Sequence, residues 1–420
     1  MIFYGWIIVS VGLMAMFAAT FTGGAGFSVF LQPMASDLGW SRALLAGGLS
    51  IGTLAGALLA PFFGAIADRF GPRAVLTFCG LGIACTLSLV STVTEPISFL
   101  IAFGLARAID MGALNVAVST SVSNWFVRQR GRALGIAMAG NALGVMLLVP
   151  VAQALITTAG WRTAWLVLGG GTGLLLAVLA AIFLRHRPED MGLLPDGDPA
   201  PSPESRAAQP ADSAWSVREA AQSRSFWLLV VANAFGQAAI SGLTVHQAAL
   251  LQSQGVSAAV AALAVSFYGL TWAAGSMGMG RLAERVPSNI ALAFSFGLVA
   301  VCLIAVAHIR SEAVALSFAL VYGLANGGKE ALDALVWADY FGRRSVGGIR
   351  GLSRPFVIGA SASGPVLGGL GYDLFNDYSS VVLVFAGLAS IGALAASIAR
   401  RPLPPEREAL INPEAPAHAH

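Results

Sequence analysis

Five charged side chains lie deep inside long apolar runs, and they are the residues of this 420-residue chain best suited to chemistry. Arg107 and Asp110 belong to one run, and Lys329, Glu330 and Asp333 belong to another. A charge at the centre of a bilayer costs roughly 2.5–3.5 kcal/mol even on the gentler insertion scale, so we expect all five to face the interior of a helix bundle. Cations at such depth can attract an anion, and partly desolvated carboxyl groups can carry protons.

The spacing of these charges allows each group to share one helix face. Arg107 and Asp110 are three residues apart, Glu330 and Asp333 also three, and Lys329 and Asp333 four. We predict that Arg107 and Lys329 bind substrate and that Asp110, Glu330 and Asp333 couple transport to protons. The alternative is that ion pairs Arg107–Asp110 and Lys329–Asp333 only neutralise buried charge.

Lys329 is the only lysine, whereas the chain has 23 arginines. It follows Asn326-Gly327-Gly328, which predicts a weak or locally unwound helix beside its ammonium group. Asn233, Gln237 and His246 share another apolar run and are further candidates for binding substrate, and His246 could also relay protons. Hydrogen-bonded contacts between helices are the alternative for these three residues.

The composition excludes several classes of protein. Charged residues make up 11% of the chain, against about 25% in soluble domains, and 56% of the residues are hydrophobic. A soluble enzyme or a disordered chain cannot have this composition. The net charge of +3 comes without a basic stripe, which excludes nucleic acid as a partner. The sequence has no catalytic constellation, phosphate loop or metal-ligand spacing, so we expect no enzymatic activity, no cofactor and no metal.

Twelve apolar runs are long enough to cross a bilayer, which needs roughly 20 residues per helix. We predict an all-α membrane protein with twelve transmembrane helices in two pseudo-symmetric six-helix bundles. The bundles are 1–184 and 226–399, joined by a Pro-rich cytoplasmic linker at 185–225 and followed by a disordered cytoplasmic tail at 400–420. The runs are Trp6–Leu31, Ala43–Ile66, Ala74–Val93, Ile97–Trp125, Ala133–Thr157, Thr163–Leu184, Phe226–Leu251, Ser257–Leu282, Ser288–His308, Ala313–Trp337, Gly347–Leu370 and Ser380–Ala399.

The distribution of basic residues predicts the orientation. Eighteen arginines flank the runs on one side, and only Arg42, Arg162 and Arg310 lie on the other. This bias places both termini and the linker in the cytoplasm of a cell whose inner membrane holds the protein.

The two halves repeat one another. Gly64-Ala-Ile-Ala-Asp68-Arg69 recurs as Gly280-Arg-Leu-Ala-Glu284-Arg285, at an offset of 216 residues, and Gly131 and Gly135 recur at the same offset as Gly347 and Gly351. A duplicated six-helix unit predicts a pseudo-two-fold axis with a binding site between the halves.

The stretch Gly64-Ala-Ile-Ala-Asp68-Arg69-Phe-Gly71-Pro-Arg73 resembles the signature loop of the major facilitator superfamily. The resemblance implies a cytoplasmic gate formed by Gly64, Asp68, Arg69, Gly71 and Arg73. Gly280, Glu284 and Arg285 would be its counterparts in the second half. Membrane anchoring by the two arginines is the alternative, although it leaves Asp68 and the glycines unexplained.

Within that superfamily the chain resembles the monocarboxylate and oxalate/formate transporter branch. The matching pieces include Tyr4-Gly-Trp6, Gly39-Trp40-Ser-Arg42 and Tyr372-Asp373. Two positions depart from the branch: Ser276 replaces an anion-binding arginine, and Ala25 replaces the lysine of the animal members. Arg107 also resembles a fourth-span arginine motif associated with proton coupling, with Met111 in place of its glycine.

These patterns predict a secondary active transporter that moves a small organic anion, foremost a monocarboxylate, by alternating access. Transport would be coupled to protons, as symport, or to exchange for a counter-anion. The alternatives are proton-coupled efflux of a neutral or cationic compound and a membrane sensor of the same fold that does not transport. The sequence does not distinguish a monomer from a dimer.

Overall fold

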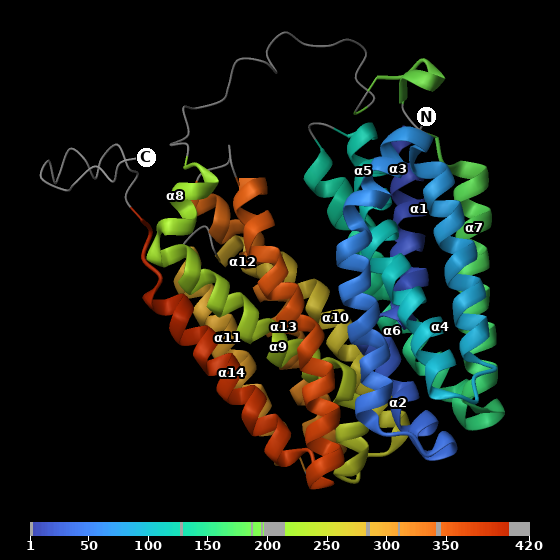
Figure 1. Cartoon of the computed structure of the whole chain (residues 1–420), viewed down its shortest axis with the longest axis vertical. Coiled ribbons are helices and arrows are strands. Elements are labelled where there is room, and N and C mark those ends of the chain that lie inside the picture. The colour runs from blue at the N-terminus through green and yellow to red at the C-terminus, as the bar shows by residue number, and fades with distance from the viewer. Residues whose placement is uncertain are drawn as a thin grey trace, which may run out of the picture.

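A computed structural model describes residues 3–126, 129–185, 188–194, 196, 215–282, 286–309, 311–341 and 346–402 of the chain. Within these ranges every regular element is a helix, which confirms the predicted all-α class. The helices gather into two bundles that stand side by side with their long axes along the molecule (Figure 1).

The first bundle contains two sharp reversals of the chain. The structure continues as one helical segment through Gly71 (φ 80°) and again through Gly160 (φ 84°), where the left-handed backbone favours glycine. Helix α3 therefore carries two of the predicted runs, whereas α6 carries one run and only the first residues of the next, which continues through the second π-helical segment and α7. The elements are α1 (Gly5–Ala18), a 3₁₀ turn (Ala19–Thr22), α2 (Gly24–Leu38), α3 (Arg42–Val90), α4 (Pro96–Ile109), a π-helical segment (Asp110–Leu114), α5 (Asn115–Trp125), α6 (Arg130–Ala164), a second π-helical segment (Trp165–Gly170) and α7 (Gly171–Phe183).

The second bundle is built from longer uninterrupted helices. These are α9 (Arg224–Ser253), α10 (Ala258–Leu282), α11 (Ser288–Val306), α12 (Glu312–Phe341), α13 (Val346–Phe375) and α14 (Ser379–Ile398). They pack closely where a small residue lets two backbones approach, as where Gly275 of α10 meets the backbone of Leu324 on α12.

The predicted linker contains more regular structure than expected. A 3₁₀ turn (Pro188–Met191) follows the first bundle, and a short helix, α8 (Val217–Gln222), precedes α9. Ser216 and Glu219 form a capping box at the start of α8, and hydrogen bonds from Ser216 hold the pKa of Glu219 below its usual range. Residues 197–214 of the linker and 403–420 of the predicted tail lie outside the described residues.

Nine helical stretches in the described residues are long and apolar enough to cross a membrane. One of them, Arg132–Phe183, contains the reversal at Gly160 and so corresponds to two predicted runs. The runs in α12 and α13 are not among the nine: α12 carries Lys329, Glu330 and Asp333, and α13 is rich in Gly, Ser and Pro. The count of twelve crossings stays a prediction.

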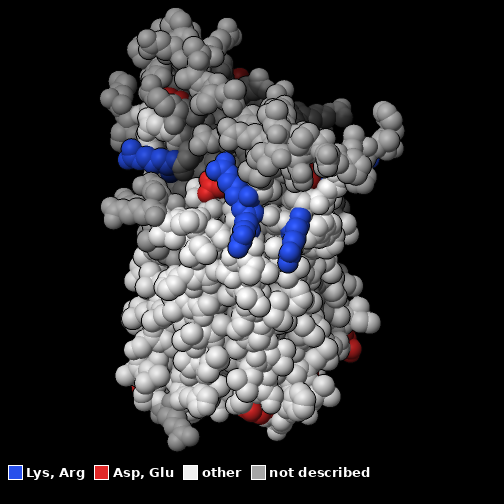
Figure 2. All heavy atoms as spheres, turned by 90° about the vertical axis from the view of Figure 1, so that its left-hand side faces the viewer, with Lys and Arg blue, Asp and Glu red and all other residues white. Residues whose placement is uncertain are grey.

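The two ends of the molecule differ. The described ends of the chain and α8 lie at one end, and the basic side chains of the face in Figure 2 gather toward it. At the opposite end the two bundles are in contact: hydrogen bonds join the start of α3 to the end of α13. We call this second end the closed end.

Candidate functional site

The charges of the first bundle form a hydrogen-bonded cluster. Arg107 Nη1 donates to Asp110 Oδ2 (2.7 Å), and its Nε donates to the Thr53 hydroxyl (3.1 Å). Asp110 also accepts hydrogen bonds from the Thr22 hydroxyl (2.8 Å) and from Nδ2 of Asn115 (3.1 Å). The carboxylate is buried, with 5% of the residue exposed. The Arg107–Asp110 ion pair of the alternative interpretation is therefore present, and it neutralises both charges.

Two irregular backbone segments bring these groups together. The 3₁₀ turn between α1 and α2 ends at Thr22, and the π-helical segment begins at Asp110. A π-helical turn shifts the side chains that follow it relative to a regular α-helix, and such turns are frequent at functional sites. Here Asn115, the first residue after the segment, reaches back to both the backbone and the side chain of Asp110.

The charges of the second bundle do not pair as the spacing suggested. Lys329 is 5% exposed, and its Nζ donates to Oε1 of Gln237 on α9 at 2.5 Å. Among the described residues it forms no ion pair. The alternative pair Lys329–Asp333 is thus absent, because Asp333 accepts instead from Arg350 Nη2 on α13 (2.9 Å) and from Trp337 Nε1 (3.2 Å). Glu330 is exposed.

The prediction of an unwound turn before Lys329 is wrong. Helix α12 runs without a break through Asn326, Gly327 and Gly328. A Cβ at Gly327 would overlap the carbonyl oxygen of Trp272, so this glycine serves close packing of α12 on α10. The ammonium group is presented from a regular helix.

Polar residues that the sequence reasoning missed lie near Lys329 on the same helix face. Asn326 Nδ2 donates to the Tyr268 hydroxyl of α10 (2.5 Å), and the rings of Tyr268 and Tyr322 stack with centroids 5.3 Å apart. The Tyr322 hydroxyl donates to the backbone oxygen of Ile240 on α9 (3.2 Å). Tyr322, Asn326 and Lys329 are spaced by four and three residues, which is the signal that could have revealed them.

The structure separates the other predicted binding residues. Gln237 contacts Lys329, and Asn233, one turn earlier on α9, donates to the Leu229 carbonyl (3.0 Å) while its buried Oδ1 has no described partner. His246 lies nine residues beyond Gln237, about 13 Å along the helix, and belongs to the closed end.

At the closed end a cluster centred on Arg42 joins the bundles. Its guanidinium donates to the Tyr378 hydroxyl (2.6 Å) and to Gln32, and it lies 3.6 Å from the ring centroid of Tyr372. The backbone N–H groups of Arg42 and Ala43 donate to the Asp373 carboxylate (3.2 and 3.1 Å). We call Arg42, Tyr372, Asp373, Tyr378 and His246 the closed-end cluster.

The predicted gate lies largely beyond what can be described. Gly64, Asp68 and Arg69 belong to α3, and Gly280 belongs to α10. The surroundings of these four residues lie outside what the structure describes. Glu284 and Arg285 lie outside the described residues. Gly71 forms the reversal within α3, and Arg73 donates to the Ala181 carbonyl of α7 (2.5 Å). The gating role of these residues stays a prediction.

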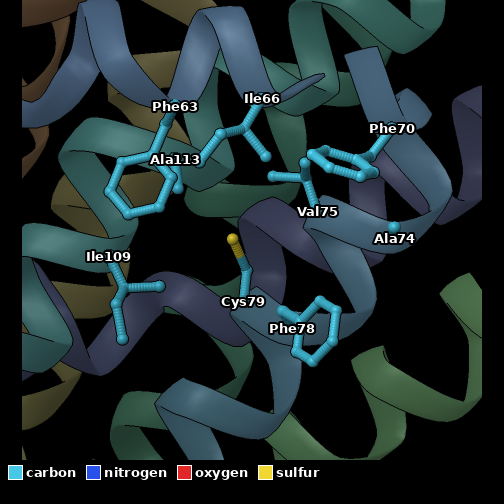
Figure 3. A pocket seen from close by; sticks show the side chains of 9 residues that line it. All are labelled: Phe63, Ile66, Phe70, Ala74, Val75, Phe78, Cys79, Ile109 and Ala113. Atoms are coloured by element: carbon cyan, nitrogen blue, oxygen red, sulfur yellow. The ribbon is translucent and has the colours of Figure 1, made fainter. Parts of the chain in front are cut away.

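A separate pocket of about 470 Å³ opens between the two halves of α3 and the end of α4 (Figure 3). Its lining has no charged side chain, and the Cys79 sulfur points into it. Such a surface can bind apolar groups, but it offers no hydrogen-bond or charge partner to a small ion. The lining residues are Phe63, Ile66, Phe70, Ala74, Val75, Phe78, Cys79, Ile109 and Ala113.

Comparison with known proteins agrees with this architecture. The family model described as Major Facilitator Superfamily matches residues 11–354, most of the chain. The chain belongs to the Major Facilitator Superfamily. The fold is shared with solved structures of that kind, including a bacterial homolog of the human lysosomal transporter Spinster in an inward-facing, unoccupied conformation (TM-score 0.73, 18% identity, 94% of this chain and 97% of the other). A mutant of the nucleoside transporter NupG is similar as well (TM-score 0.74, 13% identity, 93% and 99%).

The proteins to which this chain is similar in sequence are transporters. It is 23% identical over 377 residues to the uncharacterized MFS-type transporter YcxA of Bacillus subtilis, covering 87% of this chain and 88% of the relative. It is 25% identical over 358 residues to monocarboxylate transporter 12 of Rattus norvegicus, covering 80% and 72%. The prediction of a multi-pass membrane transporter, and not an enzyme, is confirmed by these matches.

Proposed function

We propose that this superfamily member carries a small organic monoanion, foremost a monocarboxylate, and that Lys329 is the cation that binds it. The observation that carries the proposal is the charge balance of the ionisable groups around Arg107 and Lys329. Arg107 is paired with Asp110 and Arg350 with Asp333, whereas the buried ammonium of Lys329 contacts only the neutral amide of Gln237 in the part of the chain that the structure describes. A buried charge without a partner is costly, and one bound monoanion would compensate it.

The surrounding groups suit the recognition of a carboxylate. Asn326, one turn before Lys329, and the Tyr268 hydroxyl that it contacts can donate or accept hydrogen bonds beside the ammonium group. The resemblance to monocarboxylate transporters supports the same substrate class. The alternative cargo, a cation, receives less support because Asp110 and Asp333 are already held by arginines.

Proton coupling is proposed for the three intramembrane carboxyl groups, with Glu330 as the principal one. Asp110 and Asp333 accept hydrogen bonds from Arg107 and Arg350, so both carboxyl groups already have a cationic partner. Glu330 is exposed and takes part in no ion pair among the described residues, so no described cation competes with a proton for its carboxyl group. The arginine bias of the sequence supports a location in the cell's inner membrane with both termini in the cytoplasm.

Flux measurements on purified protein in proteoliposomes test the proposal. A panel of small monocarboxylates, with dicarboxylates, neutral solutes and cations for comparison, is added to vesicles that contain a pH-sensitive dye. We expect saturable uptake of a monocarboxylate, which Lys329→Ala lowers by roughly 10- to 100-fold, the range for losing a hydrogen bond to a charged group. Arg354→Ala removes an exposed cation of α13 and should transport normally.

The panel also identifies the competing functions. Transport of a cation in exchange for protons, with no carboxylate flux, would replace the proposal by efflux. Binding of a solute without flux of any would indicate a sensor. Carboxylate uptake that is unchanged in Lys329→Ala would remove Lys329 from the binding site.

A further inference from the structure

We propose that His246 is a proton-binding site of the closed end, and that protonation of its imidazole ring separates the two bundles there. This role differs from substrate binding at Lys329, and it does not depend on the identity of the cargo. His246 is 1% exposed and lies on α9 at the centre of the closed-end cluster.

The hydrogen bonds of His246 fit the neutral ring with its hydrogen on Nε2. Its Nε2 lies 2.9 Å from the backbone oxygen of Pro365, and its Nδ1 lies 3.0 Å from the Tyr378 hydroxyl. A carbonyl oxygen can only accept, so Nε2 carries a hydrogen, and in the neutral ring Nδ1 then accepts one from the Tyr378 hydroxyl. The Tyr378 oxygen in turn accepts from Arg42 Nη1 (2.6 Å). A directed chain therefore runs from Arg42 through Tyr378 and His246 to Pro365.

A second proton on the ring breaks this chain. The imidazolium donates from both nitrogens, so the Tyr378 hydroxyl loses the acceptor to which its hydrogen points. The Tyr378 oxygen would then face two cationic donors, Nδ1–H of His246 and the guanidinium of Arg42. Since Arg42 belongs to the first bundle and Tyr378 to the second, the bond that weakens is one that holds the bundles together.

The groups around His246 do not compensate the added charge. The one carboxylate in the cluster, Asp373 of α13, is engaged by the backbone N–H groups of Arg42 and Ala43. Tyr372 of α13 lies against the Arg42 guanidinium, and the facing polar residue of α2 is the neutral Gln32. Helix α14 has no ionisable residue. From α10 and α12, the tyrosines Tyr268 and Tyr322 lie beside Thr244, two residues before His246.

Opening of the closed end would expose the ring to water, where an imidazole takes up a proton near pH 6.5. One proton that binds only the open form shifts the equilibrium toward that form about tenfold for each pH unit below this value, and has no effect well above it. Because alternating access requires each end to open once per cycle, external acid would favour the form that admits substrate and proton together.

Spin labels at the closed end measure this equilibrium without any substrate. Thr94, between α3 and α4, and Ser311, just before α12, are exposed and belong to opposite bundles. They are replaced by cysteines in a variant in which Cys79, Cys85 and Cys302 are alanines, and the distance between labels is recorded by double electron–electron resonance in nanodiscs. We expect one short distance at pH 8, and a longer one whose ratio to the short one rises about tenfold between pH 6 and pH 5.

Three variants assign the response to its group. His246→Gln should have the same distances at pH 8 and pH 5, since the amide does not titrate in this range. Tyr378→Phe should lower the short-distance population at pH 8 and reduce the pH response, because the hydroxyl that senses the ring is gone. Asp373→Asn keeps an acceptor oxygen and should retain the response.

Two results would overturn the proposal. The first is a spin-label distance that does not change between pH 8 and pH 5 in the protein without the His246, Tyr378 or Asp373 substitutions. This result does not depend on whether those variants fold. The second is a pH response that persists in His246→Gln or is lost only in Asp373→Asn, since the proton would then bind elsewhere.

Discussion

Asp373 caps a helix of the opposite bundle at Arg42. Its two carboxylate oxygens accept from the backbone N–H groups of Arg42 and of Ala43, the first two residues of α3, at 3.2 and 3.1 Å. A helix N-terminus carries unpaired N–H groups and partial positive charge, so a carboxylate there is favourable. Since the carboxylate belongs to α13, this cap exists only while the bundles are in contact.

Asp373→Ala is therefore expected to destabilise the closed end. Loss of an N-terminal cap costs about 0.5–2 kcal/mol, so the ratio of closed to open forms should fall by roughly 2- to 30-fold. The spin-label pair at Thr94 and Ser311 measures that ratio at pH 8. Asp377→Ala is the matched control, because the described bonds of Asp377 are to Ser379 within its own turn. Equal distances in both variants would show that the cap does not hold the bundles.

Gln237→Glu tests the charge balance at Lys329. The new carboxylate would lie within hydrogen-bond reach of the ammonium group and occupy the position that a substrate anion needs. We expect KM for a transported monocarboxylate to rise roughly tenfold or more at pH 8 and to recover in acid, where the glutamate becomes neutral. The exposed Gln222→Glu adds the same charge outside the membrane and should leave KM unchanged. A normal KM at pH 8 in Gln237→Glu would contradict anion binding by Lys329.

The sequence was sufficient to find the buried charges, but not their partners. Apolar runs around Arg107 and Lys329 are visible without a structure, and a spacing of three allowed the pair with Asp110 that forms the alternative interpretation. The spacing of four between Lys329 and Asp333 failed, since neighbouring helices offered both groups other partners. Which helix lies beside which is set by tertiary packing, and helix periodicity does not contain that information.

The closed-end cluster was missed for a related reason. Arg42, His246 and Tyr378 are more than a hundred residues apart in sequence, and arginines and aromatic residues at the ends of apolar runs are typical membrane-interface anchors. Gly327 was misread as a sign of unwinding, because a glycine that permits close packing and one that weakens a helix look alike in sequence.

Gly327→Ala should consequently lower the stability of the second bundle. A methyl group there would overlap the Trp272 carbonyl of α10, and overpacking of this kind costs about 1–3 kcal/mol. We expect the Tm of the detergent-solubilised protein to fall by several degrees. Gly387 is also within a helix, but its Cβ position is open, so Gly387→Ala should keep or slightly raise Tm. Equal Tm values for the two variants would show that α10 can move away from α12 at Gly327 without loss of stability.

The Arg107–Asp110 pair predicts a non-additive pair of variants. Asp110→Ala leaves the partly buried guanidinium, 16% exposed, without its anion and should destabilise the protein by up to about 3–5 kcal/mol, because a largely desolvated charge remains. Arg107→Met combined with Asp110→Ala removes both charges and should recover most of that loss, as measured by Tm and by urea unfolding in detergent.

Recovery of stability with continued substrate-driven proton flux would show that the pair is structural and that Glu330 carries the proton. Recovery of stability with loss of proton flux would instead assign the coupling to Asp110. A double variant as unstable as Asp110→Ala would contradict the charge-balance argument itself, since it holds that the unpaired charge, and not the lost hydrogen bonds, sets the cost.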